Sequence, residues 1–125
     1  MILNLYRKLS SIAEKYIVVI NSQIIYFPSG EPHKLRLFIV DGSTVDIWLS
    51  SSGKYSYHWE RRQIYKGIYR FDNAQHKRWE KIKTYPKHFH SGDELNVKES
   101  NISGNPEEAI KEILDFINSK LKSEK

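Results

Sequence analysis

The chain begins and ends with segments in which apolar residues recur every three or four positions. In residues 2–14 these are Ile2, Leu5, Tyr6, Leu9, Ile12 and Ala13, the spacing of one face of an amphipathic helix. In the last segment they are Ala109, Ile110, Ile113, Leu114, Phe116, Ile117 and Leu121. An N-cap residue, Asn105, and a first-turn proline, Pro106, precede this second stripe. The pattern therefore predicts a helix near each end.

Between these segments the pattern changes to β-branched and aromatic residues, which alternate with polar ones in places. Turn signals lie at residues 28–32, at the Asp41-Gly42 pair and at residues 50–53. The strands that we predict are residues 16–27, 34–40, 44–49, 54–62 and 67–73. Because their links are short, they are expected to form an antiparallel meander. Residues 86–94 contain the breakers Pro86 and Gly92 and are expected to be irregular.

This order predicts one α+β domain, residues 1–125, with an N-terminal helix, a four- to five-stranded antiparallel meander sheet and a C-terminal helix. Strand parity places Val45, Ile47, Leu49, Tyr55, Tyr57, Trp59, Tyr69 and Phe71 on the face under the helices. The other face collects Ser56, His58, Glu60, Arg62, Arg70 and Asp72. We expect this second face to be uncovered, polar and basic.

Composition narrows the classes of protein further. The chain has 125 residues, a formal net charge of +5 and no cysteine, which excludes disulfides, CxxC redox pairs, cysteine zinc sites and thiol nucleophiles. The first residues lack the apolar centre of a signal peptide, and the longest purely apolar run, residues 16–20, is far shorter than a membrane span. These features predict a small, basic, cytoplasmic domain without membrane association.

The polar sheet face carries groups suited to metal-independent cleavage of RNA, which needs a base, an acid and a cation but no cofactor. We predict that His58 and either His88 or His90 transfer protons, and that Arg62 and Arg70 bind phosphate. Asp72 is expected to orient a histidine or an arginine, or to cap the turn at residue 73. The competing interpretation is a solvated sheet face without chemistry.

Two further groups carry candidate chemistry. His88 and His90 point to the same side of an extended segment, so they could hold a metal ion with a third ligand, either His76 or Asp72, or they could only anchor a loop to its own backbone. Cations and aromatics are dense in residues 76–90, a mixture that suits single-stranded nucleic acid. The candidate nucleic-acid-binding residues are Lys77, Arg78, Trp79, Lys81, Lys83, Tyr85 and Lys87. A solvated loop with a few rings packed beneath it is the alternative.

Several motifs in one order resemble the TumE-type toxin family of type II toxin–antitoxin modules over about residues 35–120. They are Asp41-Gly42-Ser43, the YSYH segment at residues 55–58, the YRFDNAQH segment at residues 69–76 and the PKHFHSG segment at residues 86–92. The chain departs from the family pattern at Gln75, where proline is usual, at Lys77, where a second histidine is common, and at Leu49, where members often carry glutamate. The resemblance implies a toxin with a small antitoxin partner and an RNA target.

The predicted order of elements also resembles RelE/barnase-like ribonucleases, as an analogy of fold alone. Our first hypothesis is therefore a toxin that acts as a metal-independent endoribonuclease. The alternatives are a non-catalytic RNA- or protein-binding module that uses residues 76–90, and a metal-dependent hydrolase that uses His88 and His90. Association into a homodimer is left open.

Overall fold

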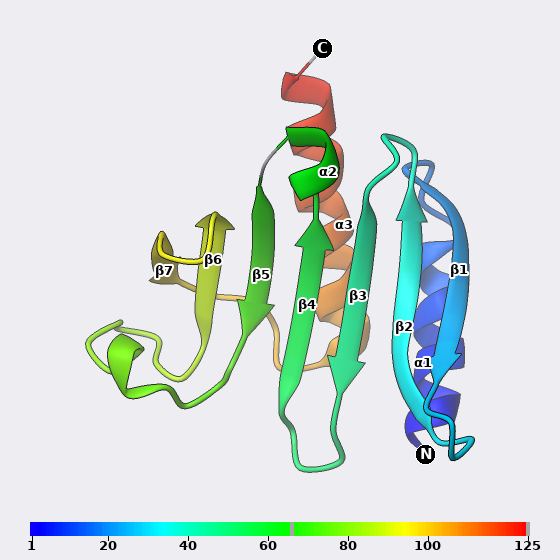
Figure 1. The fold of residues 1–125 in the computed structure, drawn as a ribbon, viewed down its shortest axis with the longest axis horizontal. Coiled ribbons are helices and arrows are strands. Elements are labelled where there is room, and N and C mark those ends of the chain that lie inside the picture. The colour runs from blue at the N-terminus through cyan, green and yellow to red at the C-terminus, as the bar shows by residue number, and fades with distance from the viewer. Residues whose placement is uncertain (66, 125) are drawn as a thin grey trace.

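Within residues 1–65 and 67–124, which the computed structural model describes, seven antiparallel strands form one meander sheet (Figure 1). Each strand pairs with the next one along the chain. The strands are β1 (Val19–Tyr26), β2 (Pro32–Ile39), β3 (Thr44–Leu49), β4 (Tyr55–Glu60), β5 (Ile68–Asp72), β6 (His88–Gly92) and β7 (Val97–Glu99). The helices are α1 (Ile2–Ala13), α2 (Arg62–Tyr65) and α3 (Pro106–Ser123), with a short 3₁₀ turn, η1 (Lys77–Trp79).

The α+β class, the two terminal helices and the antiparallel meander are confirmed, but the expected number of strands is wrong. The strands β6 and β7 lie in or next to the segment that we expected to be irregular. The two breakers delimit β6 instead of interrupting it, because Pro86 precedes the strand and Gly92, at a φ of 91°, is its last residue. A glycine tolerates this left-handed backbone, which starts the turn toward β7.

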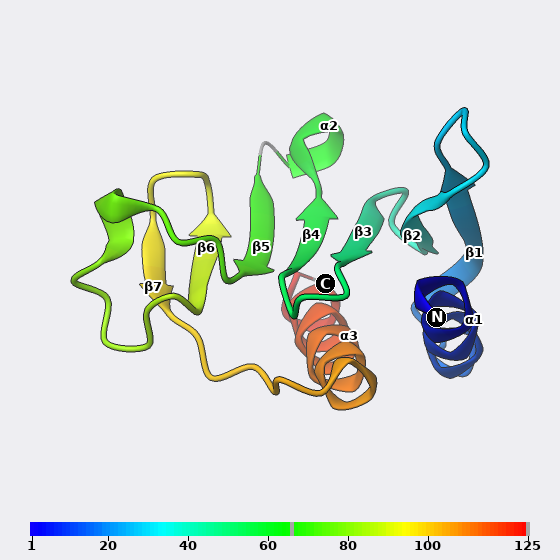
Figure 2. The same cartoon turned by 90° about the horizontal axis from the view of Figure 1, so that it is seen from below.

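Both long helices pack on one face of the sheet (Figure 2), where the core lies. The predicted inner face is confirmed, because the side chains of β3 and β4 that point toward the helices are buried and those of β5 are half-buried. Tyr6 joins α1 to the sheet, since its hydroxyl accepts a hydrogen bond from the backbone N–H of Leu49 at 3.0 Å. Asn105 caps α3 as predicted, accepting from the N–H of Glu107 at 2.9 Å.

An aromatic cluster fixes α3 beneath the strands that carry the polar face. The ring of Phe116 meets the rings of Trp59, Tyr69, Phe71 and Phe89 at centroid distances of 5.4 to 6.2 Å, in each case close to edge-on. Edge-to-face contacts of this kind are favourable beyond the area that they bury. The strands β4, β5 and β6 are therefore held in register from the helix side.

A buried ion pair lies on the helix side of the sheet, at the C-terminal end of α3. Arg61 is 2% exposed, and its guanidinium donates to Asp41 at 3.0 Å and to Glu124 at 2.7 Å while it lies 4.3 Å from the ring centre of Trp59. Two carboxylates compensate for the cost of burying this cation. The contact joins the β2–β3 hairpin to the C-terminal end of α3.

Candidate functional site

Strand register places three candidate residues in one row on the face away from the helices. His58 on β4 lies opposite Arg70 on β5, and Arg70 lies opposite His90 on β6. In the adjacent row, Ser56 pairs with Asp72 and Asp72 pairs with His88. Directly opposite side chains in neighbouring strands are about 5 Å apart at their Cβ atoms, so this pairing brings the groups into contact.

Arg70 stands at the centre of these contacts. Its Nε donates to Oδ2 of Asp72 at 3.0 Å, and its two terminal nitrogens donate to the two carboxylate oxygens of Glu94 at 2.8 and 2.6 Å. Nη1 also lies 3.4 Å from Nδ1 of His58, and Nη2 lies 3.3 Å from Nε2 of His90. The hydrogen bonds to Glu94, opposed by partial burial, raise the pKa of Arg70, so it remains a cation.

The hydrogen bonds of the two flanking imidazoles allow their tautomers to be assigned. Nδ1 of His90 lies 2.9 Å from the carbonyl oxygen of Glu94 and donates to it, while Nε2 faces Nη2 of Arg70 at 3.3 Å and Oδ2 of Asp72 at 3.5 Å. Nε2 is bare in the neutral ring and carries a hydrogen in the imidazolium. Nε2 of His58 lies 3.0 Å from Glu60, whose pKa is lowered to about 2, mainly by hydrogen bonding from Arg62. Because Glu60 is ionised, Nε2 of His58 donates to it and Nδ1 is bare. Arg70 therefore lies between the bare Nδ1 of His58 and Nε2 of His90.

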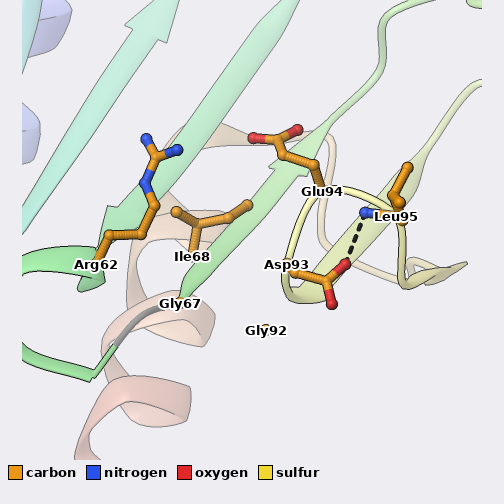
Figure 3. Close-up of a pocket in the computed structure, with 7 residues that line it drawn as sticks. All are labelled: Arg62, Gly67, Ile68, Gly92, Asp93, Glu94 and Leu95. Atoms are coloured by element: carbon orange, nitrogen blue, oxygen red, sulfur yellow. Dashed lines mark hydrogen bonds between the residues drawn. The ribbon is translucent and has the colours of Figure 1, made fainter.

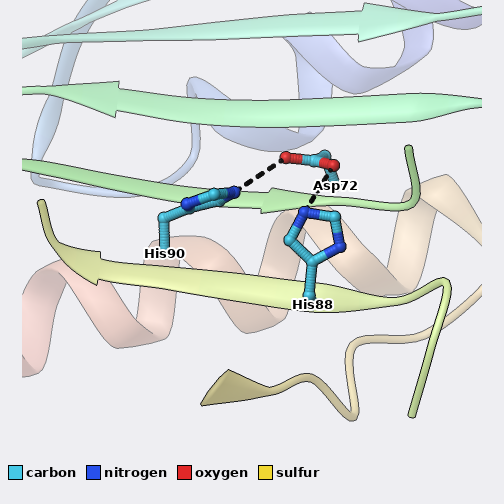
Figure 4. Close-up of side chains that lie close together, drawn as sticks. All are labelled: Asp72, His88 and His90. Carbon is cyan, nitrogen blue, oxygen red and sulfur yellow. Dashed lines mark ion pairs between the residues drawn. The ribbon is translucent and has the colours of Figure 1, made fainter. Parts of the chain in front are cut away.

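Asp72 lies between the rings of His88 and His90 (Figure 4). Its Oδ1 is 2.9 Å from Nε2 of His88 and accepts from the N–H of Ala74 at 3.0 Å. Burial raises the pKa of this carboxyl, but the hydrogen bonds that it accepts outweigh burial and hold the pKa below its ordinary value. Nδ1 of His88 lies 2.8 Å from the carbonyl oxygen of Pro86, so the ring connects this carbonyl to the carboxylate of Asp72.

The loop of residues 73–87 folds over this part of the sheet. The ring of Trp79 lies 6.3 Å from that of His88 and 5.9 Å from that of His90, centre to centre. Between this loop and the sheet is a cleft of about 260 Å³ that Asp72, both histidines and Trp79 help to line. The expectation of an uncovered face is therefore wrong for Asp72, which is 7% exposed. His88 and His90, which we expected in an irregular segment, are 1% and 3% exposed. His58 and Arg70 are half-buried.

Arg62 does not join this group. The strand β4 ends at Glu60, and Arg62 is the first residue of α2, where its exposed guanidinium binds Glu60 at 2.7 Å. It lines a different pocket, of about 340 Å³, together with Gly67, Ile68 and the β6–β7 turn (Figure 3). Glu94 lines both this pocket and the cleft.

Of the two third ligands considered for a metal ion, the structure brings Asp72 to the histidine pair. The candidate ligand atoms of Asp72, His88 and His90 all lie within 4.8 Å of one another. His76 instead lies at the start of η1, where its Nδ1 accepts from the N–H of Arg78 at 3.1 Å. The guanidinium of Arg70 already supplies positive charge to the carboxylate of Asp72.

The predicted nucleic-acid-binding residues all lie in the 73–87 loop, beside the cleft. Residues 76–87 contain five cations and one carboxylate, so most of the positive excess of the chain is concentrated there. The exposed members are Lys77, Arg78, Lys81 and Lys83, and the half-buried ones are Trp79, Tyr85 and Lys87.

Sequence reasoning missed the role of two carboxylates. Parity placed Glu60 on the correct face, two positions after His58, but we did not consider it as a partner of that histidine, whose Nε2 lies 3.0 Å from it. Glu94 reaches Arg70 from the β6–β7 turn, which no periodic pattern marks.

Comparison with known proteins tests the resemblance to the TumE toxin family. The sequence matches the protein-family model described as toxin TumE over residues 8–121, which is nearly the whole chain. No curated protein and no solved structure matches it. Among the described residues, no helix has the length and apolar character needed to cross a membrane. The match begins within α1, ends within α3 and includes the whole sheet and the cleft, and the chain therefore belongs to the TumE toxin family.

Proposed function

We propose that this TumE-family toxin cleaves RNA as a metal-independent endoribonuclease and that an antitoxin partner restrains it. The observation that supports this proposal best is the row of His58, Arg70 and His90, in which a guanidinium lies between Nδ1 of one imidazole and Nε2 of the other. These are the three kinds of group that the transesterification of RNA requires.

In the proposed reaction, Nδ1 of His58 takes the proton of a ribose 2′-hydroxyl. The 2′-oxygen then attacks the adjacent phosphorus, and the bond from phosphorus to the 5′-oxygen breaks. A protonated His90 gives its Nε2 proton to that leaving oxygen, so the products are a 2′,3′-cyclic phosphate and a free 5′-hydroxyl. Arg70 stabilises the negative charge that develops on the phosphate oxygens between these steps.

Glu94 occupies the position that a phosphate would take. Its carboxylate receives both terminal nitrogens of Arg70, the same forked geometry in which a guanidinium binds phosphate. Glu94 is half-exposed, so substrate phosphate can replace it without unfolding the sheet. Asp72 and His88 are positioning residues, because Asp72 holds the Nε of Arg70 and His88 holds Asp72.

The 73–87 loop is the proposed RNA-binding surface. Its exposed lysines and arginine lie beside the cleft and can pair with phosphates on either side of the cleaved bond. An acidic segment of an antitoxin would bind to the same cations, which would prevent RNA from binding.

The test is cleavage of an RNA oligonucleotide by the purified protein in the presence of EDTA. We expect the wild type to cleave and His58→Ala to lower the rate by about 10²- to 10⁴-fold while RNA binding persists. His33→Ala is the matched control, because His33 stacks on Phe27 at 4.2 Å and belongs to no contact of the cleft. In cells, we expect His58→Ala to lose toxicity and His33→Ala to keep it. Cleavage by His58→Ala at the wild-type rate would refute the proposal.

A metal-dependent hydrolase is the second candidate, and one observation favours it. Both histidines of the pair direct Nδ1 to a backbone carbonyl and Nε2 toward Asp72, as histidine ligands of metals commonly do. In that case chelation would abolish cleavage, and added divalent metal would restore it.

A non-catalytic binding module is the third candidate function. It would show no cleavage at all, a steep decrease in RNA affinity with salt and a gradual decrease as successive lysines are neutralised.

A further inference from the structure

We infer that the sheet face carries a nucleobase-binding subsite on Trp48, on the other side of Arg70 and Asp72 from the Trp79 cleft. This inference rests on the proposed function and extends it by naming the substrate. The substrate is a single-stranded stretch of RNA, held with its phosphate at Arg70 and with the bases on its two sides against Trp48 and Trp79.

Strand pairing places Trp48 beside the catalytic row. Trp48 on β3 lies opposite Ser56 on β4, which in turn lies opposite Asp72 on β5. Trp48 and Asp72 are therefore two strands apart, about 10 Å at the backbone, and their side chains share the face away from the helices. Because only the small side chain of Ser56 stands between them, the surface is hollow there.

This hollow is a pocket of about 310 Å³ beside the cleft. Trp48, Lys54 and Ser56 line it on one side, and Arg70 and Asp72 line it on the other. Trp48 is 37% exposed and does not belong to the core cluster, so its side chain is accessible to a ligand in this pocket. A volume of this size is that of a small-molecule site.

The two hollows share a wall. Arg70, Asp72 and Ala74 line both the Trp48 pocket and the cleft under Trp79, so each hollow combines one indole with the same guanidinium. Single-stranded nucleic acid presents this alternation of flat bases with an anionic phosphate between them. Bases in a duplex are stacked on one another and cannot offer a free face to either ring, so the arrangement favours unpaired RNA.

The rim of the Trp48 pocket is fixed by hydrogen bonds. Oδ1 of Asn73 accepts from the N–H of Tyr55 at 2.9 Å, and its Nδ2 donates to the carbonyl oxygen of Gly53 at 3.0 Å. The β3–β4 turn is thereby joined to the end of β5. Lys54, exposed on this rim, supplies a cation for the next phosphate of the strand.

The test is the affinity of a dye-labelled, single-stranded 2′-O-methyl RNA hexanucleotide, measured by fluorescence anisotropy. This probe lacks the 2′-hydroxyl and cannot be cleaved by the proposed route, so binding is measured apart from catalysis. We expect Trp48→Ala to weaken binding by about 5- to 100-fold, the effect of losing one stacked base. Trp48→Phe, which keeps an aromatic face, should remain within about threefold of the wild type by the same argument.

Two controls separate stacking from a structural effect. Tyr26→Ala removes an aromatic ring that is also exposed but lies on β1, at the sheet edge, and should leave affinity unchanged. An abasic residue placed at each position of the probe in turn should, at one position, remove the difference between wild type and Trp48→Ala. Equal affinities for wild type and Trp48→Ala, or equal losses in Trp48→Ala and Trp48→Phe, would overturn the inference.

Failure of this inference is distinguishable from failure of the proposed function. If RNA is cleaved but Trp48→Ala binds the probe like the wild type, the subsite is wrong and the catalytic row stands. If Trp48→Ala weakens binding but the wild type leaves RNA intact, the subsite stands and the catalytic assignment is wrong.

Discussion

Replacing Asp72 by asparagine tests whether the buried carboxylate organises the site. Asp72 is 7% exposed and receives the Nε of Arg70, the N–H of Ala74 and the Nε2 of His88 within 3.0 Å. The amide of asparagine keeps one acceptor oxygen but turns an NH₂ group toward donors that had a carboxylate partner. Removing one member of a buried ion pair costs about 3–5 kcal/mol. Because Arg70 keeps its contact with Glu94, we expect the lower end, about 3 kcal/mol.

The assay is urea unfolding at pH 7, followed by tryptophan fluorescence, with a thermal melt as a second measure. A loss of about 3 kcal/mol corresponds to a decrease in melting temperature of roughly 10 °C for a domain of this size. Asp46→Asn is the matched control, because Asp46 lies on the same sheet face and binds Lys34 and Arg36, both at 2.7 Å, but is more exposed. We expect that control to lose about 1 kcal/mol.

The pH dependence gives a second check on the same variant. The pKa of Asp72 is lowered in the folded protein, so its stabilisation is complete above its unfolded pKa and is lost as the pH falls through the folded pKa. The difference in stability between wild type and Asp72→Asn should therefore shrink below about pH 4. The carboxylate of Asp72 does not organise the site if Asp72→Asn lowers the free energy of unfolding no more than Asp46→Asn does. The same conclusion follows if the difference in stability between wild type and Asp72→Asn is independent of pH.

Three further predictions follow from individual contacts. Glu94→Gln weakens the carboxylate that competes with phosphate for Arg70, so affinity for the 2′-O-methyl probe should rise about 3- to 10-fold, and weaker binding would contradict this. The pKa of Glu60 is lowered from 4.5 to about 2, so its stabilising contact with Arg62 is present above pH 4.5 and is lost as the pH falls toward 2. As the pH falls, the melting temperature should therefore decrease more steeply for the wild type than for Glu60→Gln. Parallel curves would exclude this contribution of Glu60. Phe116→Ala removes a ring that meets four others, and urea unfolding should show a loss of about 2–3 kcal/mol because Phe116 is only half-buried.

Elements with local signals were predictable from the sequence. The helix α3 is marked by its N-cap and by its apolar stripe, and β3 and β4 are marked by strict alternation between turn residues. The same alternation places His58, Arg70 and Asp72 on one face.

What the sequence did not reveal depends on contacts between distant segments. The strand β6 forms because β5 offers it a hydrogen-bonding edge, whereas Pro86 and Gly92 in isolation indicate an irregular segment. The burial of His88 and His90 comes from Trp79, which reaches them through a loop without periodicity. Arg62 left the predicted row because the chain turns into α2 immediately after β4, and a change of element cancels the parity rule.

The proposed function depends most on the chemistry of the ribose 2′-hydroxyl at the His58–Arg70–His90 row. A DNA oligonucleotide with one ribonucleotide in its centre, incubated with the wild-type protein in EDTA, tests this directly when the ends of the products are identified by mass spectrometry. We expect one cut, immediately 3′ of the ribonucleotide, that leaves a 2′,3′-cyclic phosphate and a 5′-hydroxyl. Cleavage of the all-DNA strand, or products that carry a 3′-hydroxyl and a 5′-phosphate, would contradict it.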